Sequence, residues 1–351
     1  MRPAARLSMP AEAATFRAFD TVIDTRSPAE FAEDHVPGAI SCPVLSNEER
    51  ARVGTLYKQS SPFEAKKVGA ALVARNISVH IEAEFLAKPR TWKPLVYCWR
   101  GGKRSGAMAH ILREVGWDAR TLEGGYKSYR RHVVESLARL PQTFIFRVIH
   151  GATGSGKSRL LRTLAGTGAQ VLDLEELAAH RGSVLGGLPE RPQPSQKMFE
   201  SLLLKSLLTL DPARETYVEG ESRKIGQLQL PAALIERMRA SECLRLEASL
   251  ETRVALLMGE YRHFFTDLAQ LNAQLDCLAS LHGRERVGEW KSLAASDEWQ
   301  ALVYRLLQEH YDPAYRRSAS HNFPRLAGAK ILPLNSAEEV AFANLARIFH
   351  E

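Results

Sequence analysis

The 351-residue sequence lacks long apolar runs, repeats and a secretion signal. It has no stretch of 18 apolar residues, which argues against a membrane-spanning helix and a membrane partner. Its first twenty residues show neither a long apolar segment nor a signal-peptide pattern, so we expect a cytoplasmic protein. No internal repeat or low-complexity tract stands out.

Cysteine is also scarce, and its spacing excludes two roles. The four cysteines lie far apart, at Cys42, Cys98, Cys243 and Cys277. None forms a CxxC pair, so the usual spacing of metal ligands is absent. Disulfides are not expected in a reducing cytosol. A functional cysteine would therefore act as a single reactive thiol.

The composition is that of a globular protein with an excess of positive charge. Apolar residues make up 45% of the chain, which allows a sizeable core, and the length predicts two domains. Lys and Arg number 47 against 40 Asp and Glu, for a net charge of +7. This balance favours a polyanionic partner such as nucleic acid, although an ordinary basic surface is the alternative interpretation.

The first part of the chain alternates predicted strands and helices. Short buried strands are expected at residues 20–25, 94–99 and 119–125. Ser27, with Glu30 three residues later, forms a capping box that starts a helix. A second helix runs from residue 105 and stops at Gly116, a typical C-cap. Strands that alternate with helices predict a parallel α/β sheet.

A boundary is expected at residues 138–142, around Pro141, which gives domains 1–138 and 139–351. The second domain has the same alternation. Its strand candidates are residues 143–151, 169–175, 215–221, 242–248 and 330–335. Residues 339–351 are expected to form a closing helix. The prediction is thus two α/β domains in one chain.

A glycine loop opens the second domain and predicts a phosphate site. "GATGSGKS" at residues 151–158 matches G-x-x-x-x-G-K-[ST], follows an apolar strand and opens a helix. Backbone N–H groups of such a loop surround a phosphate at a helix N-terminus. Lys157 reaches a terminal phosphate, and the Ser158 hydroxyl can bind Mg²⁺. The predicted phosphate-binding residues are Gly151, Gly154, Ser155, Gly156, Lys157 and Ser158.

Charged residues beyond this loop are candidate partners for a phosphate or a metal ion. Asp173 and Glu219 each stand at the carboxyl end of a predicted strand, where ligands of parallel sheets bind. Arg223 and Lys224 follow Glu219 and could contact phosphate. The alternative for Asp173 and Glu219 is a solvated loop acid.

A second glycine loop lies in the first domain and carries a cysteine. "CWRGGKRS" directly follows the strand at 94–99 and leads into a helix. Its candidate site residues are Cys98, Trp99, Arg100, Gly101, Gly102, Lys103, Arg104 and Ser105. Loop N–H groups, three cations and the helix N-terminus all favour a thiolate at Cys98. Such a thiolate fits sulfur or selenium transfer, and because Cys98 and Arg104 satisfy C-x5-R, it also fits phosphatase chemistry.

Longer motifs carry a resemblance to known families. "IDTRSPAEFAEDHVPGAISCPV" (23–44) resembles the opening of a rhodanese domain, and "LEGGYKSYRR" (122–131) resembles its end. The rhodanese pattern matches Asp24, Arg26, His35, Gly38 and Ala39. The segment at 49–77 is not general to rhodaneses. With "DLEELAAHRGSVLG", "QPSQKMFES" and "VEGESRKIG" in the second domain, the chain resembles the tRNA 2-selenouridine synthase family over residues 20–350.

The resemblance implies a rhodanese-like domain fused to a P-loop NTPase-like domain, and a two-step activity. Geranyl diphosphate alkylates the sulfur of wobble 2-thiouridine in the tRNAs for Lys, Glu and Gln, and selenium from selenophosphate then displaces geranylthiol. Cys98 would serve the selenium step, and Gly151 to Ser158 would hold the diphosphate rather than ATP. No tightly bound cofactor is implied, although Mg²⁺ could take part. A selenophosphate-producing enzyme would be a partner.

Three interpretations remain open from the residues. The alternatives to the selenotransferase are an ATP-dependent small-molecule kinase fused to a sulfurtransferase or C-x5-R phosphatase domain, and a non-catalytic tRNA-binding module with a structural P-loop. Sequence-specific reading of tRNA would target splayed anticodon bases. The candidate stacking residues are Trp99, Tyr126 and Tyr129, each of which could instead pack in the core.

Overall fold

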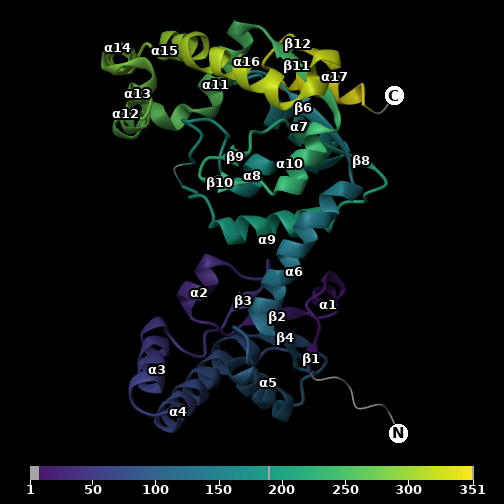
Figure 1. The fold of residues 1–351 in the computed structure, drawn as a ribbon, viewed down its shortest axis with the longest axis vertical. Helices are drawn as coiled ribbons and strands as arrows, with labels where there is room; N and C mark the ends of the chain where they lie inside the picture. Colours follow the sequence, from purple (N-terminus) through teal and green to yellow (C-terminus); the bar gives the residue numbers. More distant parts are fainter. Residues whose placement is uncertain (1–7, 189, 350–351) are drawn as a thin grey trace. The chain divides into compact units, whose positions relative to one another are not determined.

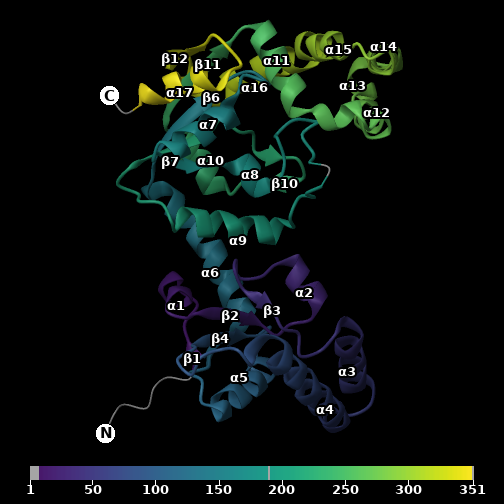
Figure 2. The same cartoon turned by 180° about the vertical axis from the view of Figure 1, so that it is seen from behind.

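The computed structural model describes residues 8–188 and 190–349 (Figures 1 and 2). The chain forms two compact units that interleave in sequence. The first unit holds the described residues up to Ser136 and also Ser195–Leu208; the second holds Leu137–Pro194 and the described residues from Thr209 onward. The sequence-based boundary at 138/139 did not foresee that residues 195–208 pack with the first unit. No described helix is long and apolar enough to cross a membrane.

The sheet of the first unit has five parallel strands in the order β1-β5-β4-β2-β3. Its strands are β1 (Ser8–Met9), β2 (Thr21–Asp24), β3 (Ile40–Ser41), β4 (Pro94–Tyr97) and β5 (Arg120–Leu122). The three predicted strands are confirmed as β2, β4 and β5. The other two are only two residues long, too short to leave a periodic pattern in the sequence.

Helix α5 (Lys103–Val115) shows why this unit folds as predicted. It buries Ser105, Met108 and Leu112 on one face, at spacings of three and four residues that share a helix side. The helix ends at Gly116, whose φ of 106° is left-handed and suits glycine. Met108 and Leu112 pack in a core cluster with residues of β2 and β4, which fixes the helix against the sheet.

The first unit has further helices on either side of α5 in the sequence. They are α1 (Ala13–Arg17), α2 (Pro28–Glu33), α3 (Asn47–Gln59), α4 (Pro62–His80), α6 (Gly125–Arg139) and α9 (Gln196–Leu207). The capping box of α2 is confirmed, since the Ser27 N–H donates to the Glu30 carboxylate at 3.1 Å. Helices α3 and α4 pack together and contain most of the segment at 49–77.

Helix α9 joins the first unit through a buried polar network. Asp34 is fully buried and accepts hydrogen bonds from the Tyr126 hydroxyl of α6 and the Ser201 hydroxyl of α9, each at 2.8 Å. Arg130 of α6 also pairs with Glu200 of α9. A buried carboxylate needs such donors, and they tie this late segment of sequence to the first unit.

The second unit has its own parallel sheet in the order β12-β11-β6-β8-β7. Its strands are β6 (Ile145–His150), β7 (Gln170–Leu172), β8 (Glu215–Glu219), β11 (Glu242–Ala248) and β12 (Lys330–Leu334). All five predicted strands are present. The strand predicted at 169–175 is shorter, because the Asp173 carboxylate accepts from the Glu176 N–H at 2.8 Å and starts helix α8 (Leu174–Ala178) there.

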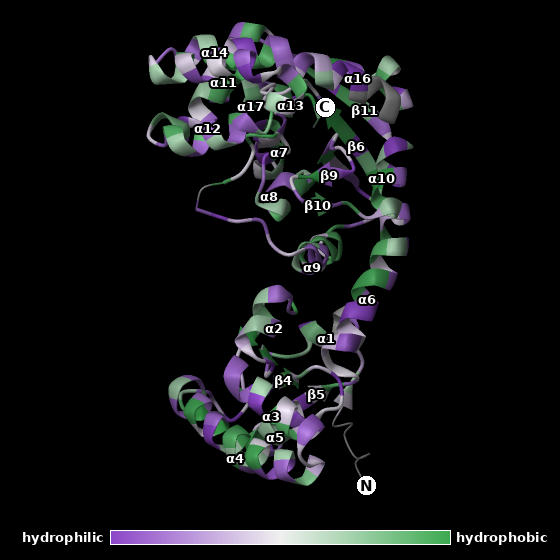
Figure 3. Ribbon diagram, turned by 60° about the vertical axis from the view of Figure 1, so that its left-hand side comes forward, coloured by the Kyte–Doolittle hydropathy of each residue, from purple (hydrophilic) through white to green (hydrophobic). Residues whose placement is uncertain are grey.

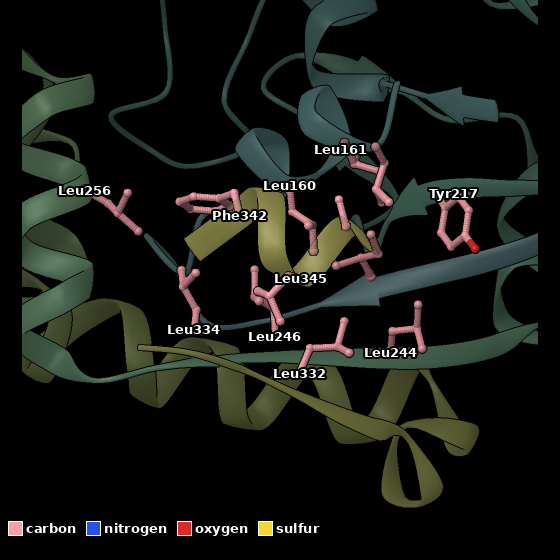
Figure 4. Packing of buried hydrophobic residues seen from close by; sticks show 13 residues of the cluster. Leu160, Leu161, Tyr217, Leu244, Leu246, Leu256, Leu332, Leu334, Phe342 and Leu345 are labelled. Atoms are coloured by element: carbon pink, nitrogen blue, oxygen red, sulfur yellow. The ribbon is translucent and has the colours of Figure 1, made fainter. Parts of the chain in front are cut away.

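One face of this sheet is covered by α7 (Lys157–Gly166) and α17 (Glu339–Arg347). Figure 4 shows Leu160 of α7 and Phe342 of α17 packed over Leu246 and Leu334 of the strands, in one apolar cluster. The predicted closing helix is confirmed as α17, while residues 350–351 lie outside the described part. Residues alternate sides along a strand, so Phe146 belongs to the opposite face, against which α10 (Ala232–Arg239) packs.

A group of helices is inserted between β11 and β12. It comprises α11 (Leu250–Glu260), α12 (Leu268–Asp276), α13 (Ala279–His282), α14 (Arg284–Ala295), α15 (Trp299–Leu306) and α16 (Asp312–Asn322). Figure 3 shows these helices striped in green and purple, the pattern of amphipathic helices. The apolar sides of α12, α14 and α15 meet around Trp290, which is fully buried. A small antiparallel pair, β9 (Lys224–Ile225) and β10 (Leu228–Gln229), follows β8.

Candidate functional site

The cysteine loop lies between β4 and α5, where the sequence places it. Cys98 follows the last residue of β4, and Gly102, with a left-handed φ of 70°, caps the N-terminus of α5. The Ser105 hydroxyl donates to Cys98 Sγ at 3.3 Å, and both side chains are buried. The loop therefore offers Cys98 a hydroxyl donor beside a helix N-terminus.

The second glycine of "LEGG" explains how this loop is held from behind. A Cβ atom at Gly125 would lie 2.4 Å from the Cys98 carbonyl oxygen, so only glycine fits. That close approach lets the N–H groups of Tyr126 and Lys127 donate to the carbonyl oxygens of Cys98 and Trp99, at 2.8 and 3.1 Å. The first turn of α6 thus fixes the loop backbone, and the glycine pair has a structural role at the site.

The cations of this loop do not all converge on the sulfur, contrary to the sequence-based expectation. The Arg104 guanidinium donates to Glu30 of α2 at 3.0 Å. The side chains of Arg100 and Lys103 are exposed, as is Gly101. A charge-assisted hydrogen bond to a nearby carboxylate stabilises a partly buried guanidinium. Arg104 is therefore held beside the loop through Glu30.

Only one of the three candidate stacking residues is accessible to a base. Trp99 is 42% exposed, whereas Tyr126 and Tyr129 are 3% and 4% exposed. Tyr126 stacks on Trp99 with ring centroids 5.4 Å apart and donates its hydroxyl proton to buried Asp34. The two tyrosines are thus packing residues, and Trp99 beside Cys98 is the remaining candidate for stacking.

The phosphate loop lies between β6 and α7 and has the expected geometry. Gly154 and Gly156 have left-handed φ values of 76° and 87°, and a Cβ at Gly156 would lie 2.7 Å from the Phe342 ring. The Lys157 ammonium donates to the Gly151 carbonyl at 3.0 Å, which folds it back over the loop. Buried Ser155 has a hydroxyl with no partner among the described residues. The loop thus has the left-handed glycines that a phosphate-binding loop requires.

Three glutamates, rather than the two predicted acids, face this loop. Carboxylate oxygens of Glu175, Glu219 and Glu221 lie within 4.8 Å of one another. The Ser158 hydroxyl donates to Glu175 at 2.8 Å and lies 3.2 Å from Glu219. Glu219 ends β8 as predicted, while Asp173 caps α8. Sequence reasoning missed Glu175 and Glu221; the signal was their position two residues after Asp173 and Glu219.

These acids strongly affect one another. Burial raises the pKa of Glu219 well above its ordinary value, and the charge of Glu175 adds to the effect. Burial, followed by the charge of Glu221, raises the pKa of Glu175 to about 8. Glu221 and Asp173 also have raised pKa values, with burial as the main cause. Together the acids lack the positive charge that would let all of them ionise.

A divalent cation fits this cluster. Oε1 of Glu219 is buried and has no hydrogen-bond partner among the described residues, so it is free to act as a ligand. Carboxylate and hydroxyl oxygens are the ligands that Mg²⁺ prefers. Ser158, Glu175, Glu219 and Glu221 are therefore the residues that could hold such an ion.

Most of the predicted phosphate-site residues line one cavity of about 660 Å³. Gly151, Gly154, Gly156, Lys157, Ser158 and Asp173 face it, together with Glu175 and Glu221. Arg223 and Lys224 do not line it; both are exposed, and Lys224 begins β9. The cavity instead receives Arg181, whose Nη1 is buried without a partner among the described residues. Arg181 lies in the "DLEELAAHRGSVLG" motif, and the sequence alone did not assign it a chemical role.

Comparisons with known proteins assign families to both units. A rhodanese-like domain family matches residues 9–132, and the family described as "tRNA 2-selenouridine synthase AAA domain" matches residues 144–282. The tRNA 2-selenouridine synthase of Marinobacter nauticus is 34% identical over 326 residues, covering 84% of this chain and 87% of that protein. The corresponding Salmonella paratyphi B protein is 35% identical, covering 84% and 88%.

A further relative is more similar over a shorter stretch. The tRNA 2-selenouridine synthase of Nitrosomonas eutropha is 39% identical over 258 residues, which cover 71% of this chain and 64% of that protein. The chain thus spans just under two thirds of that relative's length.

Proposed function

Because this chain belongs to the tRNA 2-selenouridine synthase family, we propose that it replaces the sulfur of 2-thiouridine in tRNA with selenium, in two steps. We do not propose a kinase fusion or a non-catalytic tRNA-binding module, because the matched relatives are named as synthases. The proposed substrates are geranyl diphosphate, selenophosphate and the wobble 2-thiouridine of the tRNAs for Lys, Glu and Gln. An enzyme that makes selenophosphate would supply the second step in the cytoplasm.

In the first step the thiocarbonyl sulfur attacks C1 of geranyl diphosphate. The C–S bond forms, the C1–O bond breaks, and diphosphate leaves with the electron pair while the N3 proton passes to water. The observation that carries this assignment is the cavity lined by Lys157, by glycines of the loop and by Arg181, whose Nη1 has no partner among the described residues. Positive charge placed where the leaving group gains negative charge lowers the barrier.

The acid cluster supports a cation at the same place. Ser158, Glu175, Glu219 and Glu221 would hold Mg²⁺, which when bound neutralises charge on the departing diphosphate. Lys157 donates to the Gly151 carbonyl, which keeps its ammonium at the loop, and its positive charge lowers the pKa values of Glu175, Glu219 and Glu221. In this proposal the loop with Lys157 holds the diphosphate, and the acids hold the cation.

In the second step selenium attacks C2 of the alkylated base. The C2–Se bond forms, the C2–S bond breaks and geranylthiol leaves, and water takes the phosphoryl group of selenophosphate as inorganic phosphate. We assign Cys98 to this step, because its sulfur accepts a hydrogen bond from Ser105 at the N-terminus of α5. Alkylation comes first because a thioether sulfur leaves more readily than a thiocarbonyl sulfur.

The test is nucleoside analysis of thiolated tRNA incubated with geranyl diphosphate and the Lys157→Ala variant. Removing one electrostatic donor is expected to slow alkylation by about 10²- to 10³-fold. Lys330→Ala is the matched control, since Lys330 is exposed in the same unit and does not line the cavity. Geranylation by Lys157→Ala at the parental rate would show that the loop does not serve this step.

A further inference from the structure

A second cavity opens beside the phosphate cavity and differs from it in chemistry. It lies among the inserted helices, and its volume is about 50 Å³. Beyond its rim the lining side chains are aliphatic or aromatic, and none carries a charge. They include Leu271, Phe264, Phe265, Trp299, Leu302 and Leu306. A cavity of this kind excludes water and favours a hydrocarbon.

The two cavities share a rim at the phosphate loop itself. Thr153, Ser183, Leu257, Tyr261 and Tyr311 line both. Thr153 is part of the loop, and a Cβ added at Gly154 would lie 2.7 Å from Leu257. The apolar cavity therefore begins where the phosphate-binding loop ends, with no intervening element.

The rim also places a cation at this junction. The Arg181 guanidinium lies over the Tyr261 ring, 4.9 Å from its centroid, and Tyr261 in turn stacks on Phe264 of the apolar cavity. Tyr261 thus contacts the cationic Arg181, which can bind an anion, and also Phe264, which lines the apolar cavity. A ligand that satisfies both sides carries an anionic head and an apolar tail.

Resting on the proposed function, we infer that this cavity binds the distal part of the prenyl chain and sets the chain length that the enzyme accepts. A volume of 50 Å³ corresponds to roughly three to five water-sized spheres, which suits one five-carbon isoprene unit. The first isoprene unit of geranyl diphosphate then lies at the rim, between Tyr261 and Tyr311, and C1 remains in the phosphate cavity. A third isoprene unit has no space.

The same lining argues against a nucleotide in this position. An adenine base presents ring nitrogens and an amino group that need hydrogen-bond partners when buried. Leu302, Leu306 and Leu271, all buried, provide none. The apolar cavity therefore distinguishes a prenyl diphosphate from ATP, which the phosphate loop alone does not.

The experiment measures binding to the full chain of four probes: inorganic diphosphate and the dimethylallyl, geranyl and farnesyl diphosphates. Each apolar carbon buried is expected to raise affinity about fourfold. The wild-type protein should bind geranyl diphosphate roughly 10²-fold or more tighter than inorganic diphosphate, and farnesyl diphosphate more weakly than geranyl diphosphate. Equal affinity for geranyl and inorganic diphosphate would overturn the inference.

Two substitutions change the cavity in opposite directions. Val303→Phe adds volume to a partly buried lining position and should weaken geranyl diphosphate roughly 10- to 100-fold without changing the affinity for inorganic diphosphate. Phe265→Ala removes a partly buried ring that packs on Trp299, 4.7 Å away, and should admit farnesyl diphosphate. Tyr304→Ala is the control, because Tyr304 lies on α15 but is 41% exposed and outside the lining.

The outcomes separate this inference from the proposed function. If Val303→Phe binds geranyl diphosphate as the wild type does, or loses inorganic diphosphate equally, the tail is not in this cavity. If binding follows the prediction but the wild-type protein forms no geranylated tRNA, the inference stands and the proposed alkylation is wrong. Unchanged binding of inorganic diphosphate also confirms that each variant is folded.

Discussion

Replacing His150 with phenylalanine should make the second unit resistant to mild acid. His150 ends β6, directly before the phosphate loop, and is 2% exposed. Its ring packs on Phe323, 4.2 Å between centroids, and its Nε2 has no hydrogen-bond partner in the described chain. Burial, aided by the charge of Lys157, lowers the pKa of His150 to about 4. Between pH 4 and pH 6.5 the imidazole is therefore mostly neutral in the folded protein and mostly protonated in the unfolded chain.

The sign and size of the effect follow from proton linkage. Between pH 6.5 and pH 4 the unfolded state binds the extra proton, so the free energy of unfolding falls as the pH falls. With pKa values of 4 folded and 6.5 unfolded, the loss from this one group at pH 5 is about 2 kcal/mol. His150→Phe keeps the ring contact and removes the titration. The stability difference, variant minus wild type, should therefore rise by about 2 kcal/mol between pH 7.5 and pH 5.

Urea unfolding at several pH values, followed through the transition of the second unit, measures this difference directly. Using the difference cancels the other groups, which titrate equally in both proteins. A difference that stays constant from pH 7.5 to pH 5 would show that His150 accepts a proton while folded, and that the argument from its burial is wrong.

Three further predictions concern the two sites and the tRNA. Cys98→Ser should accumulate geranylated tRNA and form little selenouridine, because a serine hydroxyl is rarely ionised near pH 7. If nucleoside analysis shows selenouridine forming at the parental rate, Cys98 takes no part in the selenium step. Asp312→Ala should lower the free energy of unfolding by about 3 to 5 kcal/mol, since it leaves the buried guanidinium of Arg253 without its ion pair. Arg253 also donates to the Thr153 carbonyl of the phosphate loop. Calorimetry measures this loss, and a change below 1 kcal/mol would contradict it. The tRNA affinity should fall linearly with log salt, by about 0.7 per single-stranded phosphate neutralised, and a flat response would exclude the basic charge as a source of binding.

The parts of the fold that were predicted are those governed by local pattern. Buried strands of four or more residues leave continuous apolar runs, and the three-residue strands β5 and β7 were also predicted. Gly116 ends α5 because its left-handed backbone suits glycine. The contribution of α9 to the first unit was not predictable in this way. It depends on Ser201 reaching a carboxylate 167 positions earlier in the chain, Asp34, and no local spacing encodes such a pairing.

The site shows the same division. The glycine loops were found because their backbone demands particular residues at fixed positions, and both lie where predicted. Glu175 was missed because it lies inside a segment that looked like a strand, and only the cap formed by Asp173 turns it toward Ser158. The apolar cavity was not foreseen either, because its lining comes from Leu185 and several separate helices whose packing is a tertiary property.

The two glycine loops share a backbone geometry and differ in the functional side chain that each carries, Cys98 or Lys157. Each follows a buried parallel strand, turns through a glycine of positive φ, Gly102 or Gly156, and opens a helix of ten residues or more. Both therefore concentrate backbone N–H groups and helix-dipole charge at one point. In one loop the residue directly after the strand is Cys98, to which we assign the selenium step; in the other Lys157 begins the helix, and we propose that it stabilises the charge of the departing diphosphate. The proposed reaction, which first expels diphosphate and then adds selenium, would use the two loops in turn.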